Sequence, residues 1–178
     1  MKIIKWKEID SKIEMKANIF RYRKVRRQSP STGEIGEFDI VECLNWVNVV
    51  AFTKEGKLVL VKQFRHGNNE ITLEIPGGAI DMGEDSLVAA KRELREESGY
   101  SSDEWSFLGK LAVNPAFMKN TCETYLALNA KKTHELELDP FEEIEVELID
   151  REEILPMIKS GEINHSLVVA ALLLASCG

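Results

Sequence analysis

Three glutamates at helical spacing, Glu93, Glu96 and Glu97, are the residues of this chain best suited to chemistry. In a helix their carboxylates would occupy neighbouring positions about one turn apart, where like charges repel and destabilise the helix. A divalent cation with oxygen ligands would remove that repulsion, and Mg²⁺ typically takes one or two protein carboxylates together with substrate phosphates. A solvated acidic face is the alternative for such a run taken alone. The candidate metal ligands are Glu93 and Glu97, with Glu96 as a further or bridging carboxylate.

The surrounding segment predicts the helix that these glutamates need, over about Ser86–Ser98. That stretch has helix-forming residues without internal Gly or Pro, and Gly99 suits the left-handed cap that often ends a helix. Leu87, Ala90 and Leu94 share one apolar stripe at helical periodicity. The glutamates therefore lie beside the face that packs against the rest of the protein.

The order of residues in Gly78–Tyr100 resembles the signature sequence of the Nudix hydrolases, which cleave a nucleoside diphosphate linked to a further group. The matching features are the leading glycine, Glu84, the run Arg92–Gly99 and a following apolar position, where Tyr100 replaces the usual aliphatic residue. The resemblance implies a Mg²⁺ or Mn²⁺ cofactor and adds the backbone carbonyl of Gly77 to the ligands. It also implies that Arg92 pairs with Glu84 and so pins the loop to the helix. Hydrolysis of a pyrophosphate bond requires such a metal site, because phosphate charge must be neutralised and a water must be aimed at phosphorus.

Two features outside this segment resemble the ADP-ribose pyrophosphatase branch of the family. The run Leu60–Arg65 is similar to that branch's strand ending in Gln-aromatic-Arg, and the resemblance implies that Arg65 reaches the substrate diphosphate. A guanidinium suits phosphate oxygens, although an ordinary surface arginine is the alternative. Glu74, in Leu-Glu-Ile-Pro-Gly-Gly, also matches the branch and could hold the loop or assist the metal.

Pro115 lies where that branch carries a proline in a Ser-Pro-Gly setting and is a candidate substrate-binding residue. Here Ala116 follows the proline, which restricts the backbone more than glycine would. The departure leaves room for nucleoside diphosphate sugars other than ADP-ribose, GDP-mannose among them. A purely structural turn proline is the alternative.

The catalytic base is expected in the acidic segment 134–143, because related enzymes supply a glutamate from a mobile loop before the last strand. By position Glu142 is the first choice and Glu143 the second, acting beside Glu97. A carboxylate there could accept a proton from the attacking water. As a bare charge run, the segment would be a solvated loop.

Recognition of the base is the least determined part of the site. Trp46 is the candidate for stacking on a purine, since aromatic rings offer a flat apolar face and a strand begins there beside the expected cleft. Phe20, Tyr22 and Phe38 are weaker candidates. A place in the core or in a dimer interface is the alternative for each of them.

Composition favours one enzyme domain in the cytoplasm. The chain has 178 residues, 44% hydrophobic and 30% charged, with a net charge of −7, so phosphate-mediated binding of nucleic acid is disfavoured. The three cysteines have no metal-like spacing and suit reduced thiols. No signal peptide is expected, and the longest apolar run, Leu167–Ala175, is about half of a membrane span.

The pattern of strands and helices predicts an α/β protein, a Nudix-type α/β/α sandwich around a mixed sheet with an N-terminal β extension. Residues 1–45 are the extension, part of the same domain and dimer-forming by resemblance, and residues 46–178 are the Nudix hydrolase domain. Expected strands span about 2–9, 17–27, 36–44, 46–53, 57–64, 71–75, 105–113, 121–129 and 143–149, and expected terminal helices span about 151–160 and 163–176.

These observations predict a metal-dependent hydrolase of nucleoside diphosphate sugars, with ADP-ribose among them. The products would be a nucleoside monophosphate and a sugar phosphate. One alternative is a Nudix enzyme acting on dinucleoside polyphosphates or oxidised nucleotides. Another is a non-catalytic nucleotide-sugar sensor, although all three carboxylates of the run are present. A homodimer without nucleic-acid or membrane partners is expected.

Overall fold

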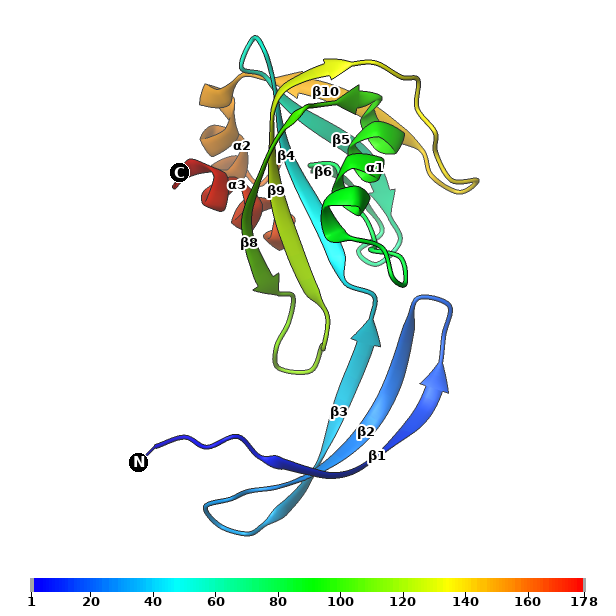
Figure 1. The fold of residues 1–178 in the computed structure, drawn as a ribbon, viewed down its shortest axis with the longest axis vertical. Helices are drawn as coiled ribbons and strands as arrows, with labels where there is room; N and C mark the ends of the chain where they lie inside the picture. Colours follow the sequence, from blue (N-terminus) through cyan, green and yellow to red (C-terminus); the bar gives the residue numbers. More distant parts are fainter. Residues whose placement is uncertain (1, 178) are drawn as a thin grey trace. The chain divides into compact units, whose positions relative to one another are not determined.

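The computed structural model describes residues 2–177, which divide into two compact units (Figure 1). Unit 1 comprises the described residues up to Leu44 together with Ala112–Thr121. Unit 2 comprises Asn45–Leu111 and the described residues from Cys122 onward. The carboxylates and the two arginines singled out above all lie in unit 2.

Unit 1 is built on a three-stranded antiparallel sheet with the order β1-β2-β3. Its strands are β1 (Lys7–Lys16), β2 (Phe20–Gln28) and β3 (Ile35–Cys43). The predicted first strand over 2–9 is wrong, because the hairpin turn after Lys16 and charge pairs across the two strands fix a different register. Arg26 lies 3.0 Å from Asp10, and Lys16 pairs with Arg21 at the turn.

Unit 2 contains a seven-stranded sheet. Five of its strands follow the order β10-β5-β4-β9-β7, and the other two pair beside them, β6 with β5 and β8 with β9. The β4–β9 pair is parallel, whereas β5 pairs antiparallel with its neighbours. The predicted mixed sheet is therefore confirmed. The strands are β4 (Trp46–Thr53), β5 (Leu58–Arg65), β6 (Glu70–Glu74), β7 (Tyr100–Ser101), β8 (Glu104–Ala112), β9 (Thr121–Lys132) and β10 (Ile144–Ile149).

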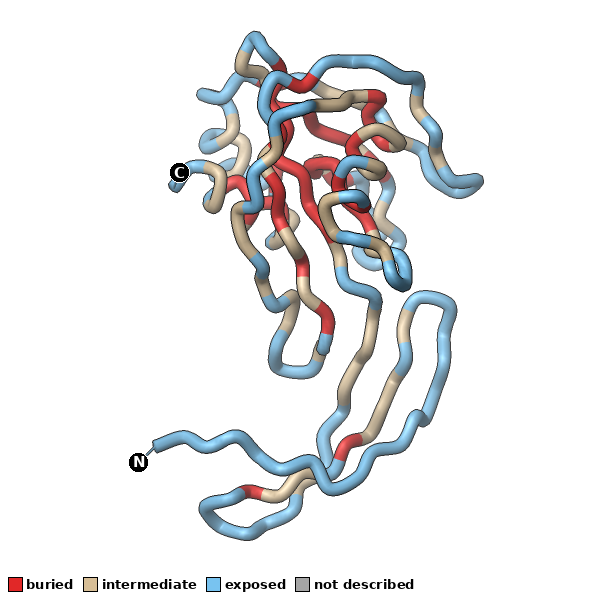
Figure 2. The backbone as a smooth tube through the Cα atoms, in the orientation of Figure 1, coloured by how far each residue is buried: buried red, intermediate tan, exposed pale blue. Residues whose placement is uncertain are grey.

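Helices cover both faces of this sheet (Figure 1). The alternating side chains of β4 belong to two separate cores, one on each face. Val47 and Val49 point into a core shared with α1 (Ser86–Ser98), while Val50 and Phe52 point into a second core. The second core includes α3 (Ser166–Ser176) and is also packed by α2 (Ile154–Ser160), which follows a 3₁₀ turn at Arg151–Glu153. A strand buried on both faces is apolar throughout rather than alternating, and the buried stretches of β4, β5 and β9 are red in Figure 2. The sequence prediction of an α/β sandwich is confirmed.

Helix α1 begins and ends where its sequence predicts. The Asp85 side chain caps the N-terminus by accepting hydrogen bonds from the backbone N–H groups of Leu87 (3.0 Å) and Val88 (3.3 Å). Gly99 takes the left-handed conformation (φ 74°) and its N–H donates to Arg95 O at 2.8 Å. These caps fix the rotation and length of the helix that carries the glutamates.

None of the helices in residues 2–177 is long and apolar enough to cross a membrane.

Candidate active site

The loop after β6 runs alongside β4 and brings its backbone to the C-terminal turns of α1. Val49 N donates to Pro76 O (2.8 Å), and Val47 N donates to Gly78 O (2.9 Å). A Cβ placed on Gly77 would lie 2.8 Å from Asn48 Oδ1 and closer still to Val47 O. Only glycine allows the loop to approach the strand this closely.

Glu97 is a buried carboxylate, with only 5% of the residue exposed. Its Oε2 atom accepts a hydrogen bond from Gly77 N at 2.9 Å. The pKa of Glu97 is raised to about 8, chiefly by burial and also by the negative charges of Glu93 and Glu142, against the opposing effect of that hydrogen bond. A buried carboxylate whose negative charge has so few compensating partners is well suited to bind a cation.

Glu93 lies on the same side of the helix and against the same loop. Its pKa is raised to about 6, chiefly by burial, while the Arg92 guanidinium opposes the shift. A Cβ on Gly78 would lie 2.6 Å from Glu93 Oε2 and closer still to Oε1. The two glycines therefore leave room for the carboxylate and for close approach of the main chain.

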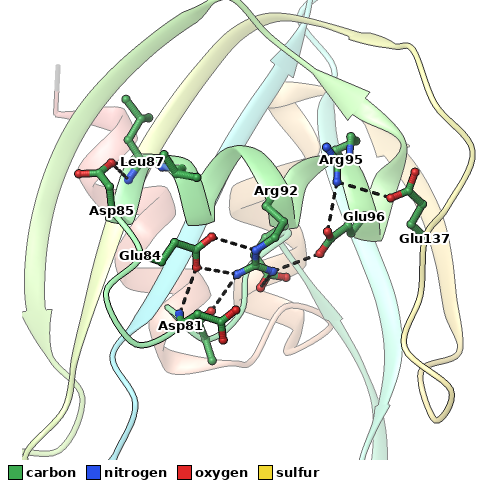
Figure 3. A network of polar contacts seen from close by, with 11 residues as sticks. Asp81, Glu84, Asp85, Leu87, Arg92, Arg95, Glu96 and Glu137 are labelled. Atoms are coloured by element: carbon green, nitrogen blue, oxygen red, sulfur yellow. Dashed lines mark hydrogen bonds and ion pairs between the residues drawn. The ribbon is translucent and has the colours of Figure 1, made fainter.

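Arg92 ties the start of the loop to the helix, as Figure 3 shows. Its guanidinium donates to both carboxylate oxygens of Glu84, each at 3.0 Å, and to Ala79 O at 3.1 Å. Nη1 also reaches Glu93 Oε1 at 2.7 Å and Glu96 Oε2 at 3.1 Å. These bonds raise the pKa of Arg92, with the bond to Glu84 contributing most, so it serves here as a fixed cation.

Glu96 is more exposed than Glu97 and is held by two arginines. Arg92 binds its Oε2, and Arg95 Nη2 lies 3.2 Å from its Oε1. The backbone O of Glu96 accepts a hydrogen bond from Glu137 N at 3.0 Å, and Arg95 contacts the Glu137 carboxylate at 3.5 Å (Figure 3). The acidic segment is therefore fastened to α1 at one point.

Arg65, at the end of β5, forms a bidentate ion pair with Glu74 at the end of β6. Nε lies 2.8 Å from Oε1 and Nη2 lies 2.9 Å from Oε2. The pairing occupies one edge of the guanidinium fork, and the side chain keeps 34% exposure. Glu97 and Glu142 also raise the pKa of Arg65, after the larger effects of burial and of Glu74, so the charge of Arg65 acts on the same site as these glutamates.

Trp46 begins β4 beside this arginine. The Arg65 guanidinium carbon is 5.9 Å from the Trp46 ring centroid, and Trp46 Nε1 donates to Asn48 Oδ1 at 3.1 Å. The indole is half-buried. Trp46 therefore lies beside Arg65, with its indole N–H held by Asn48.

The two candidate bases differ in position. The charge of Glu142 raises the pKa of Glu93 and Glu97, in each case after the larger effect of burial. Glu142 closes a turn in which Asp139 N donates to its Oε2 at 3.2 Å. Glu143 instead lines a hollow of about 300 Å³ with residues of β5 and β10, whereas Glu142 is electrostatically linked to Glu93 and Glu97.

Pro115 belongs to unit 1, as do the weaker aromatic candidates Phe20, Tyr22 and Phe38. Within unit 1 it sits in the turn that follows Asn114, whose O accepts a hydrogen bond from Met118 N at 2.8 Å. A role for Pro115 in substrate binding stays a prediction.

Sequence reasoning missed three partners of the candidate residues. Thr72 Oγ1 donates to Glu74 Oε1 at 2.6 Å, and His165 Nδ1 lies 3.1 Å from Glu74 Oε2. Asn48 joins Trp46 to α3 by donating to Leu167 O at 3.3 Å. Thr72 was signalled by its spacing from Glu74, since residues two apart share a strand face. The position of His165 depends on tertiary packing alone.

The donor set suits a hard divalent cation. Among residues 2–177, no three His, Cys, Asp or Glu side chains are already gathered as a metal-binding group. Buried Glu97 and half-buried Glu93 both have raised pKa values and lie beside a loop kept free of side chains by Gly77 and Gly78. They nevertheless provide oxygen ligands, and Glu97 provides a poorly compensated negative charge. Mg²⁺ is commonly held by one or two carboxylates, with waters and substrate phosphates completing its shell.

A family model described as NUDIX domain matches residues 45–172, so the chain belongs to the Nudix family. An ADP-ribose pyrophosphatase of Bacillus subtilis (strain 168) is 33% identical over 141 residues, covering 79% of this chain and 76% of the relative. Its counterpart in Mycobacterium tuberculosis (strain ATCC 25618 / H37Rv) is 30% identical over 158 residues, covering 87% and 75%. A protein of Bacillus methanolicus named methanol dehydrogenase activator is 34% identical over 141 residues, covering 79% and 76%.

A crystal structure of an ADP compounds hydrolase shares the fold with a TM-score of 0.86 at 22% identity, covering 99% of this chain and 95% of the other. Together with the relatives, these matches place the chain in the ADP-ribose pyrophosphatase branch of the Nudix hydrolases, which confirms the sequence prediction. It is a pyrophosphatase. Nudix hydrolases generally use divalent metal ions such as Mg²⁺ or Mn²⁺.

Proposed function

We propose that this protein hydrolyses the pyrophosphate bond of nucleoside diphosphate sugars with Mg²⁺ or Mn²⁺, with ADP-ribose and GDP-mannose as candidate substrates. The products are a nucleoside monophosphate and a sugar phosphate. The observation that carries the proposal is the pair of glutamates at the Gly77-Gly78 loop, buried Glu97 and half-buried Glu93, both with raised pKa values. The poorly compensated charge of Glu97 and the nearby cationic Arg65 suit a metal-neutralised diphosphate.

In this proposal Glu93, Glu96, Glu97 and the carbonyl of Gly77 would hold the metal. A cation bound there would supply neutralisation of phosphate charge and a more acidic attacking water. Glu96 would have to exchange its contacts with Arg92 and Arg95 for the metal. Gly77 N already orients Glu97 by donating to Oε2 at 2.9 Å, which fixes one ligand before substrate arrives.

Arg65 binds the diphosphate and Glu142 accepts the proton of the attacking water. Glu74 holds Nε and Nη2 of Arg65, which leaves Nη1 as the terminal nitrogen for a phosphate oxygen. Glu142 lies in a segment tied to α1 at Glu137, so movement of the residues after this tether would change the position of the base relative to the glutamates of α1. Glu143 is the second candidate for this role.

Trp46 supplies a flat surface beside Arg65 for the nucleoside, an assignment that rests on its aromatic ring and on its 5.9 Å distance from Arg65. We assign Pro115 to substrate binding on its resemblance to the branch alone. The alanine after Pro115 favours a range of sugars over ADP-ribose alone. A stacked aromatic ring accepts more than one base.

The remaining parts of the proposal concern assembly and location. Residues 1–45 form a β extension, with residues 46–178 as the hydrolase domain, and the extension joins two copies into a homodimer. The exposed apolar residues of β1, Ile9, Ile13 and Met15, suit such a contact. Three free cysteines suit a reducing cytoplasm. Light scattering on the purified protein tests the dimer.

The test of the activity is phosphate release after phosphatase coupling, with Mg²⁺ and with Mn²⁺. The substrates are ADP-ribose, ADP-glucose, GDP-mannose, UDP-glucose, a diadenosine polyphosphate and 8-oxo-dGTP. Preference for one or several diphosphate sugars is expected. Turnover of only the last two would reassign the chain to another substrate class, and silence with both metals would favour a nucleotide-sugar sensor.

A matched pair of variants tests the base. Glu142→Gln is expected to lower kcat about 100-fold with little change in KM, as for a group acting in the transition state. Glu143→Gln, one residue away, is the control and is expected to stay within about twofold of wild type. The reverse result would move the base to Glu143, and a rise in KM alone for Glu142→Gln would make it a binding residue.

A further inference from the structure

We propose that His165 is a positioning residue that fixes Arg65 by way of Glu74. The inference rests on the proposed function, in which Arg65 binds the substrate diphosphate. His165 immediately precedes α3 as its N-cap residue, whereas Arg65 and Glu74 end two strands of the sheet. The Glu74 carboxylate therefore links the helix to the arginine.

Every oxygen of the Glu74 carboxylate is shared between Arg65 and one further group. Oε1 is contacted by Arg65 Nε at 2.8 Å and by Thr72 Oγ1 at 2.6 Å. Oε2 is contacted by Arg65 Nη2 at 2.9 Å and by His165 Nδ1 at 3.1 Å. The Glu74 side chain is 4% exposed, so solvent is a poor substitute for any of these partners.

The imidazole of His165 must present a protonated nitrogen to the Glu74 carboxylate. His165 Nδ1 is buried and makes no hydrogen bond of good geometry to any described residue, so Glu74 Oε2 is the acceptor within its reach. Two lone pairs 3.1 Å apart would repel each other, hence Nδ1 carries the proton in the neutral ring as well as in the cation. The His165 side chain is 36% exposed overall, which leaves the opposite edge of the ring accessible.

This arrangement decides the direction in which Arg65 presents its charge. A bidentate guanidinium is planar with its carboxylate, so rotation of the Glu74 carboxylate turns the arginine as well. Thr72 restrains one oxygen and His165 restrains the other. Without His165, Oε2 lacks its second partner and the pair is free to swing, which moves Arg65 Nη1 away from the diphosphate.

Two substitutions distinguish the effect of the hydrogen-bond donor of His165 from the effect of its side-chain volume. His165→Leu keeps an apolar body of similar size but removes the donor, whereas Asn in His165→Asn can place its amide near the position of Nδ1. We expect His165→Leu to raise KM for the best diphosphate sugar about tenfold, with kcat lowered less. We expect His165→Asn to stay within about threefold of wild type. Ser166→Ala, at the next and exposed position of α3, is the control for a change at this helix terminus.

A double-mutant cycle tests whether His165 acts through the arginine. In an Arg65→Gln background, His165→Leu should have no further effect on KM, because the group that it positions is gone. Thermal unfolding of every variant accompanies the kinetics. Additive effects of the two substitutions, or equal losses for His165→Leu and His165→Asn, would overturn the proposal and make His165 a packing residue of α3.

A measurement without substrate keeps this inference separate from the proposed function. The Arg65 Nε–H signal in the NMR spectrum of the ligand-free protein reports the ion pair directly. His165→Leu should shift and broaden it, while His165→Asn and Ser166→Ala preserve it. An unchanged signal in His165→Leu would refute the positioning role, even for an active enzyme. An altered signal in a protein that hydrolyses no diphosphate sugar would leave the positioning intact and refute the proposed function.

Discussion

Glu74 and Glu97 are two buried glutamates on either side of the Gly77-Gly78 loop, and their surroundings are opposite. Glu74 is 3% exposed and Glu97 is 5% exposed. Against the cost of burial, Arg65, His165 and Thr72 lower the pKa of Glu74, whereas burial raises the pKa of Glu97 to about 8. Equal burial therefore leads to a satisfied ion pair in one case and to an uncompensated acid in the other.

The contrast shows which of the two carboxylates has its charge compensated within the chain and which is suited to bind a cation. A buried charge is tolerated when it is paired and hydrogen-bonded, and otherwise it lowers stability or stays protonated. Glu74 has its partners within the chain and so orders the strand ends. Glu97 has one backbone donor, Gly77 N, and a cation would supply the missing compensation.

The largest expected effect is on turnover. Glu97→Gln should lower kcat with Mg²⁺ by about 1,000-fold or more, because the amide keeps the shape and loses the charge that a metal requires. Steady-state kinetics at saturating Mg²⁺ measure the effect. Glu70→Gln, at an exposed position of β6, is the control, and a near-normal rate for Glu97→Gln would remove it from the metal ligands.

The next effect is on stability and falls on the other glutamate. Glu74→Gln should lower the free energy of unfolding by about 2–3 kcal/mol, since Arg65 keeps its charge but loses its carboxylate partner. The partial exposure of Arg65 keeps the loss below that of a fully buried pair. Urea denaturation without metal measures it. If Glu74→Gln were as stable as wild type, the ion pair would not order the strand ends.

Stability against pH distinguishes the two carboxylates without any substrate. A folded-state pKa raised to about 8 means that folding favours protonated Glu97, so metal-free protein should lose stability as pH rises from about 4.5 through 8. Glu97→Gln removes this titration and should be more stable than wild type above pH 8 by about 1–2 kcal/mol. Denaturation curves from pH 5 to about pH 9 give the comparison, and parallel pH profiles would refute the raised pKa.

The smallest effect comes from one donor of the satisfied carboxylate. Thr72→Val keeps the shape of the side chain and removes the hydroxyl that donates to Glu74 at 2.6 Å. We expect a loss of about 1 kcal/mol in the free energy of unfolding, typical of one hydrogen bond. A loss as large as that of Glu74→Gln would instead mean that Thr72 determines the whole cluster.

Local sequence signals were sufficient to predict the central helix, but they were insufficient to predict the first strand. Asp85, Gly99 and the apolar periodicity predicted α1 with its observed ends, because capping and amphipathicity act over neighbouring residues. The first strand was placed wrongly because charge pairs such as Asp10 with Arg26 decide its register.

Candidate site residues could be named where a family resemblance pointed to them. Residues that reach the site only through tertiary packing could not be named from the sequence. Periodicity placed Glu97 beside the apolar stripe, and its burial under the Gly77 loop arises from how that loop follows β4. His165 carries no signal in its local sequence, because its contact with Glu74 exists only once α3 packs on the sheet. The roles of these residues in catalysis stay predictions.

The parallel pairing of β4 with β9 has a consequence for synthesis of the chain. Trp46 pairs with Cys122 and Val50 with Leu126, so a growing chain must hold β4 unpaired on that side until β9 has left the ribosome. Contacts this distant in sequence close slowly, and an apolar strand left open on one side favours association with other chains. Nascent chains that stall between α1 and β9 should therefore depend on chaperones more than the finished protein does.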